Sequence, residues 1–154
     1  MVAFTTALRL GLPSIGGDYN EWGGYLNETI TLIEQAITGI VTIDVTGLTT
    51  YTVSTNDNEP DESRNAALRF TGTPSATVAV TIPAVPKQYY IRNETSKTIT
   101  VAASGGTTVS VNAGFAAIVS TDGTTCYISL LPTEGWLFEN FVQAGGGSQA
   151  LILT

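Results

Sequence analysis

Residues 77–103, TVAVTIPAVPKQYYIRNETSKTITVAA, determine the fold class of this chain of 154 residues. In the first part of this stretch, valine and isoleucine alternate with threonine and alanine. That alternation is the two-residue period of a β-strand with one buried face. Two prolines end the first strand, and two further strands follow it. The three predicted strands cover 77–82, 87–93 and 98–103.

The same pattern continues on both sides of this stretch. Threonine, valine and isoleucine are frequent, and their β-branched side chains favour strands. Gly-Gly and Asp-Gly pairs mark tight turns between the apolar runs. The other predicted strands cover 40–46, 51–54, 68–70, 107–111, 115–120 and 125–131. Short strands at a spacing of about ten residues predict a mainly β protein, with an antiparallel β-sandwich or jelly-roll-like domain over 40–131.

Upstream of the strands, the period changes to that of an amphipathic helix, which we predict over 18–39. Asp18 and Glu21 have the spacing of a capping box, and Gly39 provides a stop at the other end. Apolar side chains recur in steps of four and three residues along one face. These side chains are Trp22, Leu26, Ile30, Ile33 and Ile37.

This apolar face needs a partner, because burying a leucine or isoleucine is worth about 1.5–3 kcal/mol. One candidate partner is the sheet of the same chain. The other is two further copies of the helix, because isoleucine at successive core positions favours three strands in a parallel coiled coil. Charged residues make up only 12% of the chain, against about 25% in typical domains, which indicates that assembly covers part of the surface. The second candidate predicts a homotrimer.

The two ends of the chain differ from the strand region between them. Residues 1–17 are rich in apolar residues and threonine and are broken by Pro13, which predicts an extended docking arm. Residues 132–154 combine aromatic residues, the flexible spacer AGGGSQ and an apolar end, which predicts a C-terminal docking tail. The residues expected to make the contacts of the tail are Trp136, Phe138, Phe141, Leu151, Ile152 and Leu153.

The composition excludes several classes of function. The chain has no histidine, which excludes imidazole bases, serine–histidine triads and histidine-ligated metals. Six basic residues against thirteen acidic ones give a formal net charge of −7, which disfavours a nucleic-acid partner. The sequence has neither a signal-peptide pattern nor an apolar run of about 18 residues. We therefore expect no enzymatic activity, no cofactor, no nucleic acid and no membrane partner.

Two groups of side chains remain as candidate binding sites. Asp57, Glu59 and Asp61 offer oxygen ligands at alternate positions, which suits calcium, but the loop lacks the glycine and distal glutamate of an EF-hand. A solvated acidic loop without metal is the alternative interpretation. A second group contains aromatic side chains that would stack on carbohydrate or pack in the core. This group is Tyr89, Tyr90 and Tyr127.

The single cysteine, Cys126, lies within a predicted strand. One cysteine forms neither an intramolecular disulfide nor a CxxC redox pair. No basic residue lies beside it in the sequence to lower its pKa and activate the thiol. We therefore predict that Cys126 is a small core residue.

Two stretches are similar to proteins of bacteriophage particles. Residues 8–39, LRLGLPSIGGDYNEWGGYLNETITLIEQAITG, resemble the amino-terminal segment common in phage tail fibres, in which Gly-Asp and Trp-Gly pairs precede a helix and an Ile-Thr-Gly exit. Residues 45–128 resemble a β-rich domain that recurs in phage tail and fibre proteins. The matching points of that domain are DESRNAALRFTGT (61–73), TIPAVPKQYYIRNETS (81–96) and STDGT (120–124).

The resemblance implies a trimeric, non-catalytic virion protein that is made in the host cytoplasm and attached to other virion proteins by its amino-terminal arm and helix. A typical fibre continues into a long receptor-binding region, whereas this chain ends at Thr154. We therefore expect a homotrimeric short fibre or tail adaptor. A capsid decoration protein that stabilises the head is the alternative, and a carbohydrate-binding receptor module is a further one.

Overall fold

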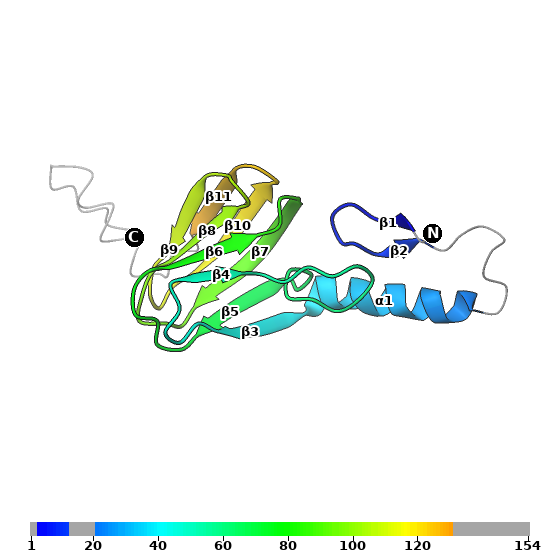
Figure 1. Ribbon diagram of the computed structural model, residues 1–154, viewed down its shortest axis with the longest axis horizontal. Coiled ribbons are helices and arrows are strands. Elements are labelled where there is room, and N and C mark those ends of the chain that lie inside the picture. The colour runs from blue at the N-terminus through cyan, green and yellow to red at the C-terminus, as the bar shows by residue number, and fades with distance from the viewer. Residues whose placement is uncertain (1–2, 13–20, 131–154) are drawn as a thin grey trace, which may run out of the picture.

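The computed structural model describes residues 3–12 and 21–130, and it consists of a short hairpin, one long helix and a β-domain (Figure 1). The hairpin strands are β1 (Ala3–Phe4) and β2 (Gly11–Leu12), and the helix is α1 (Trp22–Thr38). The strands of the domain are β3 (Ile40–Asp44), β4 (Thr50–Thr52), β5 (Ala67–Thr71), β6 (Val78–Ile82), β7 (Pro86–Asn93), β8 (Ile99–Ala103), β9 (Thr108–Val111), β10 (Ala116–Asp122) and β11 (Cys126–Leu130). The prediction of a mainly β protein is confirmed.

The β-domain consists of two mixed sheets between which the chain alternates. The first sheet has the strand order β11-β10-β7-β5-β3, and the second has the order β4-β6-β8-β9. From β3 to β8, successive strands lie in opposite sheets, and each strand pairs in parallel with the strand two places earlier. The chain therefore winds as a flattened coil through both sheets. The strands β9, β10 and β11 then pair in the antiparallel sense and end the coil.

This winding differs from the antiparallel arrangement that we expected over 40–131. The alternation of apolar and polar residues identifies the strands and their buried faces, and both are largely as predicted. It contains no information about strand direction, because a parallel and an antiparallel strand present the same alternate side chains to a core. Here each connection between parallel neighbours is a strand of the opposite sheet, so the crossover needs no helix.

One hydrophobic core lies between the two sheets. Phe70 and Ile91 of the first sheet and Val80 and Val101 of the second are buried in the same cluster. On β6, β8 and β10 the burial alternates residue by residue, so each sheet has one inward and one outward face. Burying each large apolar side chain contributes about 1.5–3 kcal/mol, so this core, and not a disulfide, stabilises the domain.

The helix begins later than we predicted. Its first residue is Trp22, Glu21 is its N-cap, and the Glu21 side chain makes no capping hydrogen bond. Glutamate is a poor N-cap residue compared with serine, threonine or aspartate. Asp18, the other half of the predicted capping box, lies outside the described residues. The predicted stop at Gly39 is confirmed, and a side chain there would collide with the Gln35 carbonyl oxygen and the Asn65 amide.

The part of the predicted arm that the structure describes, residues 3–12, is a hairpin and not an extended strand. The amide of Thr5 donates to the Leu10 carbonyl over 2.9 Å, and Arg9 has a φ of 53° in the turn. The chain reverses here because the Thr5 hydroxyl also accepts a bond from the Leu10 amide. Residues 13–17 and the predicted docking tail over 132–154, with its six contact residues, lie outside the described residues.

The turn between β8 and β9 supplies a first prediction. A Cβ atom on Gly106 would lie on top of the carbonyl oxygen of Thr124, so the two backbone segments approach too closely for any side chain. We expect Gly106→Ala to lower the free energy of unfolding by about 1–3 kcal/mol, measured by urea denaturation. Gly24→Ala is the matched control, because Gly24 has open space around it in α1, and alanine should stabilise the helix by up to about 1 kcal/mol. Equal effects would contradict the packing argument.

Candidate functional site

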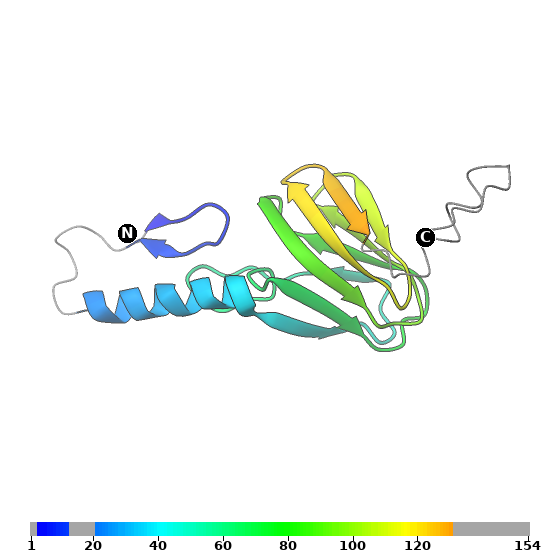
Figure 2. The ribbon, with the colours of Figure 1, turned by 180° about the vertical axis from the view of Figure 1, so that it is seen from behind.

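The apolar face of α1 is exposed to solvent in the single chain. The helix projects from the end of the β-domain and covers neither sheet (Figure 2). The exposed fractions of its five apolar residues are 62% for Trp22, 41% for Leu26, 53% for Ile30, 38% for Ile33 and 70% for Ile37. We call these five residues the exposed stripe. The alternative in which this face packs on the sheet of its own chain is therefore wrong.

A different face of α1 makes the contacts within the chain. The Gln35 amide donates to the Asp61 carbonyl over 2.9 Å, and the Glu28 carboxylate accepts from Asn58 over 3.1 Å. Leu32 lies between them on the same face and is buried. At about 100° of rotation per residue, this face lies about 150° from the exposed stripe, close to the opposite side of the helix. Among the described residues, the helix is thus held by its own chain on one side and has no partner on the other.

The exposed stripe continues onto the first sheet of the β-domain. Ile40 follows Ile37 after three residues, is 71% exposed, and begins β3 directly after the helix. The register places it in a row across the outer face of the sheet, because Ile40 pairs with Ala67, Ala67 with Tyr90, and Tyr90 with Ile118. We call Ile40, Ala67, Tyr90 and Ile118 the outer row. Ile40 therefore connects the two apolar surfaces.

The outer face of the second sheet has a different composition. Every outward position on its four strands is threonine, alanine or serine. These residues are Thr50, Thr52, Ala79, Thr81, Thr100, Ala102, Thr108 and Ser110. Small polar side chains suit a solvent-facing sheet, whereas a row with tyrosine and isoleucine suits a contact. The two outer faces of one domain therefore differ in chemical character.

Two arginines share one glutamate beside the outer row. The Arg69 guanidinium donates to the Glu94 carboxylate over 2.9 and 2.6 Å, and Arg92 lies 2.7 Å from the second oxygen of the same carboxylate. The hydrogen bonds from Arg69 lower the pKa of Glu94, with a further contribution from Arg92. These three residues line a surface depression of about 320 Å³ together with Ile40 and Tyr90. The group retains one surplus positive charge.

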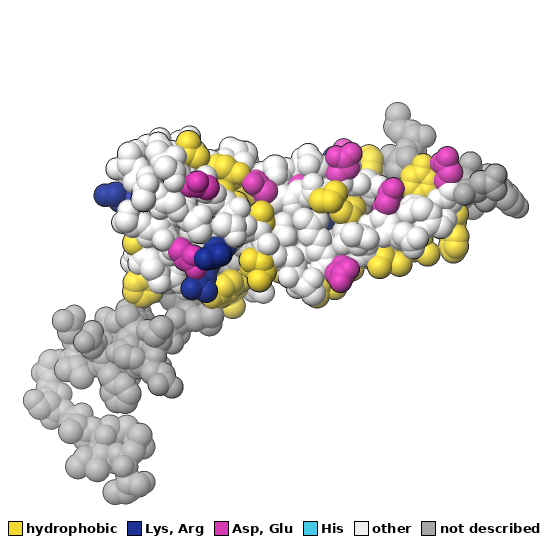
Figure 3. Space-filling model, turned by 90° about the horizontal axis from the view of Figure 1, so that it is seen from below, with side chains coloured by type: hydrophobic (Ala, Val, Ile, Leu, Met, Phe, Trp, Pro, Cys, Tyr) yellow, Lys and Arg dark blue, Asp and Glu magenta, His cyan; other side chains and the backbone are white. Residues whose placement is uncertain are grey.

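The apolar and charged groups lie along the same side of the molecule. Figure 3 shows hydrophobic side chains along the lower edge of the helical half, and on the β-domain a group of hydrophobic, basic and acidic side chains continues that edge. Sequence reasoning identified the exposed stripe but missed the outer row and the charged group. The period of a single strand predicts which residues point outward, but it does not predict which strands are neighbours.

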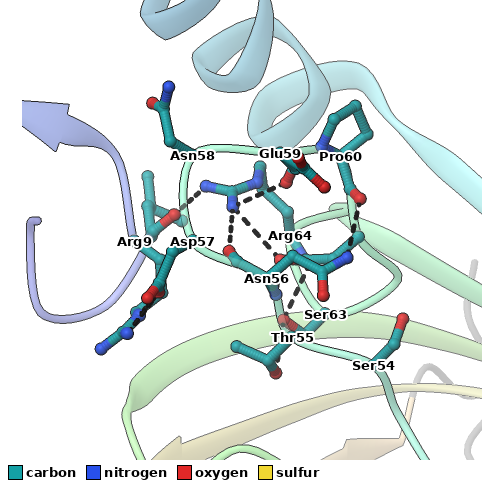
Figure 4. Close-up of polar contacts among 12 residues, drawn as sticks. Arg9, Ser54, Thr55, Asn56, Asp57, Asn58, Glu59, Pro60, Ser63 and Arg64 are labelled. Atoms are coloured by element: carbon teal, nitrogen blue, oxygen red, sulfur yellow. Dashed lines mark hydrogen bonds and ion pairs between the residues drawn. The ribbon is translucent and has the colours of Figure 1, made fainter.

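The acidic loop between β4 and β5 is organised around Arg64 (Figure 4). Although it lies in the most polar stretch of the sequence, Arg64 is almost fully buried. Its guanidinium donates to the carbonyls of Asn56 and Glu59 over 3.0 and 3.1 Å, to the Asp61 carboxylate over 3.2 Å, and to the Leu8 carbonyl of the hairpin. This side chain therefore bonds across the loop and also to the amino-terminal hairpin.

The three carboxylates proposed for calcium do not converge on one point. The Asp61 carboxylate is buried and accepts from the backbone amides of Arg64 and Asn56. Asp57 points the other way and forms an ion pair with Arg9 of the hairpin. Across residues 3–12 and 21–130, no three acidic or cysteine side chains are grouped as a metal site would require. The acidic residues of this loop instead stabilise it and connect it to the hairpin.

Two further predictions concern the tyrosines and the cysteine. Tyr89 is buried in the core, so it does not belong to a carbohydrate platform, and burial raises its pKa. Tyr90 and Tyr127 are exposed, and both point outward from the first sheet. Cys126 is buried, and its sulfur accepts from the Ala103 amide over 3.2 Å. Its prediction as a core residue is confirmed.

Lys87 supports the end of the same loop from inside the domain. Its ammonium donates to the backbone carbonyls of Ser63, Arg64 and Asn65 and lies 4.6 Å from the centre of the Tyr89 ring. Burial lowers the pKa of Lys87 to about 8, against the opposing effect of the Asp61 charge. The ordinary pKa of lysine in an unfolded chain is about 10.4.

This difference in pKa predicts how stability depends on pH. Between pH 8 and about 10.4 the unfolded chain binds a proton at Lys87 that the folded chain has lost, so the free energy of unfolding rises with pH. Allowing for partial exposure to solvent, we expect a rise of about 1–2 kcal/mol, measured by urea denaturation. Lys87→Met should remove this component and Lys97→Met should keep it. An unchanged slope in Lys87→Met would refute the assignment.

No protein-family model, curated protein or solved structure matches this chain. Among residues 3–12 and 21–130, no helix is long and apolar enough to cross a membrane. Two features of the described residues therefore bear on function. One is the apolar surface formed by the exposed stripe and the outer row, and the other is the junction at which Arg64 joins the acidic loop to the hairpin.

Proposed function

We propose that this chain is a non-enzymatic structural protein of a bacteriophage particle, a short fibre or tail adaptor that assembles as a homotrimer through α1. The observation that carries the proposal is the exposed stripe, whose five large apolar residues lie on a helix that projects from its domain. An unpartnered apolar helix face of this kind is unusual on a monomeric protein. Its work would be to bind and to bridge, not to catalyse.

The spacing of the stripe supports three helices. From Leu26 to Ile37 the steps are four, three and four residues, which is the heptad pattern of a coiled coil. Isoleucine occupies both core positions of the pattern, at Ile30 and Ile33, and continues at Ile37, the last apolar residue of the helix. Isoleucine at both positions disfavours two-stranded packing and favours trimers. The junction around Arg64 would keep each helix at a constant orientation to its own domain.

The position in a virion rests on the resemblance of residues 8–39 and 45–128 to phage tail and fibre proteins. The first turn of α1 lies at the end of the helix that is distant from the β-domain, and the hairpin lies beside the helix (Figure 1); together they would form the attachment end. The experiment is to purify phage particles that encode this chain and to measure its copy number by quantitative gel. A few copies that separate with tail proteins would support the adaptor.

Other outcomes of the same experiment would replace the proposal. Abundant copies on the head, with heads that break more easily in the absence of the chain, would favour a capsid decoration protein. Absence of the chain from particles would refute a virion function. A glycan array with hits that disappear on Tyr127→Ala would favour the carbohydrate-binding module, because Tyr127 is an outward aromatic residue of the first sheet.

A further inference from the structure

The outer face of the first sheet is a second surface without a partner in the part of the chain that the structure describes. Its inward face fills the core with Phe70, Tyr89 and Ile91. Its outward face carries the outer row and the arginines that share Glu94. Helix α1 projects beyond the end of the sheet and does not cover this face.

We propose that this outer face packs against neighbouring copies of the same chain, around the axis that the exposed stripe lines. The inference rests on the proposed homotrimer and extends it from the helix to the β-domain. The interface would contain the outer row at its centre and the group of Arg69, Glu94 and Arg92 at its border. The outer face of the second sheet would remain in solvent.

The continuity of the two surfaces is the first argument for a second copy as the partner. Ile37 ends the stripe and Ile40 begins the outer row, with the helix-to-strand joint at Gly39 between them. A side chain at Gly39 would collide with Gln35 and Asn65, so the joint is closely packed and holds α1 and β3 at one angle. An axis along the stripe therefore continues past β3.

The contrast between the two outer faces is the second argument. Tyr90 and Thr100 both lie at outward positions of central strands, yet one belongs to an apolar row and the other to a face of threonine, alanine and serine. A trimer joined at its helices would turn one face of each domain toward its neighbours and the other toward water. Joining the helices also raises the effective concentration of the domains. A contact of low intrinsic affinity between the outer faces would therefore be enough to hold them together.

The charges on this face provide the third argument. Asp44 is exposed on β3, the edge strand, whereas Arg69 and Arg92 lie on the next two strands of the same face. An edge of one copy that meets the face of the next would therefore bring opposite charges together. This arrangement is complementary to itself and needs no second kind of protein.

The test compares Tyr90→Lys with Thr100→Lys in the full chain by sedimentation equilibrium. Each variant places one lysine at an outward position of a central strand, but only the first puts it in the outer row beside two arginines. We expect Thr100→Lys to form trimers like the wild type. The Tyr90→Lys trimer should dissociate at a protein concentration at least about tenfold higher than that at which the wild-type trimer dissociates. Circular dichroism would verify that both variants fold.

The outcomes separate this inference from the trimer itself. A wild-type trimer that Ile33→Asp disrupts, but in which the two lysine variants dissociate alike, would overturn the outer-face contact and leave the helical trimer standing. A monomeric wild type would overturn both. Should Tyr90→Lys not fold, radical labelling of the wild type decides, with Tyr90 protected on assembly. Equal labelling of Tyr90 in assembled and diluted protein would overturn the inference.

Discussion

Replacing Arg64 by methionine is expected to lower the free energy of unfolding by about 3–5 kcal/mol. Methionine fills part of the volume but leaves the buried Asp61 carboxylate without its cation, and the carbonyls of Leu8, Asn56 and Glu59 without a donor. Small domains have a total stability of about 5–15 kcal/mol, so the loss is a large share of it. Urea denaturation followed by circular dichroism measures the effect.

The same variant should release the amino-terminal hairpin. The guanidinium holds Leu8 directly, and the loop it organises holds the hairpin through Asn58, which accepts from the Gly11 amide over 2.8 Å. We expect proteases to cut residues 3–12 much faster in Arg64→Met than in the wild type, under conditions in which the β-domain stays folded. Hydrogen exchange at the Gly11 amide should increase as well.

Two further variants make the prediction specific. Arg9→Met removes an arginine whose ion pair with Asp57 is exposed, so it should cost no more than about 1 kcal/mol. Arg64→Lys keeps the charge but lacks the fork of donors that reaches several acceptors, so its loss should lie between the two. An Arg64→Met variant as stable as Arg9→Met would show that the junction does not depend on the buried guanidinium.

Replacing Ile33 by aspartate is expected to convert the proposed trimer into monomers. Ile33 lies in the centre of the exposed stripe, and in a three-helix bundle each copy would bring one carboxylate to the same buried level. Three unpaired charges near one axis repel each other and lose their hydration, which costs far more than the lost contacts. The mass in solution, measured by light scattering, should fall to about a third.

The fold of the single chain should survive this change. Ile33 is 38% exposed and makes no part of the domain core, so the thermal transition of the β-domain should remain. Thr31→Asp is the matched control, because Thr31 is exposed on the opposite side of the same helix turn. A trimer that persists in Ile33→Asp, or one that is lost equally in Thr31→Asp, would show that the exposed stripe is not the interface between the helices.

Much of the local structure followed from the order of residues. The strands 77–82, 87–93 and 98–103 were predicted within about two residues of β6, β7 and β8, and the stop of the helix at Gly39 was predicted correctly. These features depend on neighbours a few residues apart, so a linear pattern contains them. The start of the helix was predicted too early, because a capping box identifies a possible cap without excluding a later one.

The site was predicted only in part, for a related reason. The stripe from Trp22 to Ile37 is visible as a helical period, but Arg64 looks like a solvated residue within NDNEPDESRN. Its burial depends on three segments that meet around it: the hairpin, the loop and the strand that carries Lys87. Likewise, Arg69, Arg92 and Glu94 become one charged group only through the pairing of β5 with β7.

The sequence by itself therefore determined the mainly β class, the apolar stripe and the absence of histidine chemistry, because composition and short periods express these directly. Only the tertiary structure decided the coiled path between two mixed sheets, the burial of Arg64 and the exposure of the stripe. The physical reason is that burial and strand pairing depend on contacts between distant segments. A helix with an apolar face looks the same in sequence whether its partner is its own sheet or another chain, and only the position of α1 outside the domain showed that the partner is not its own sheet.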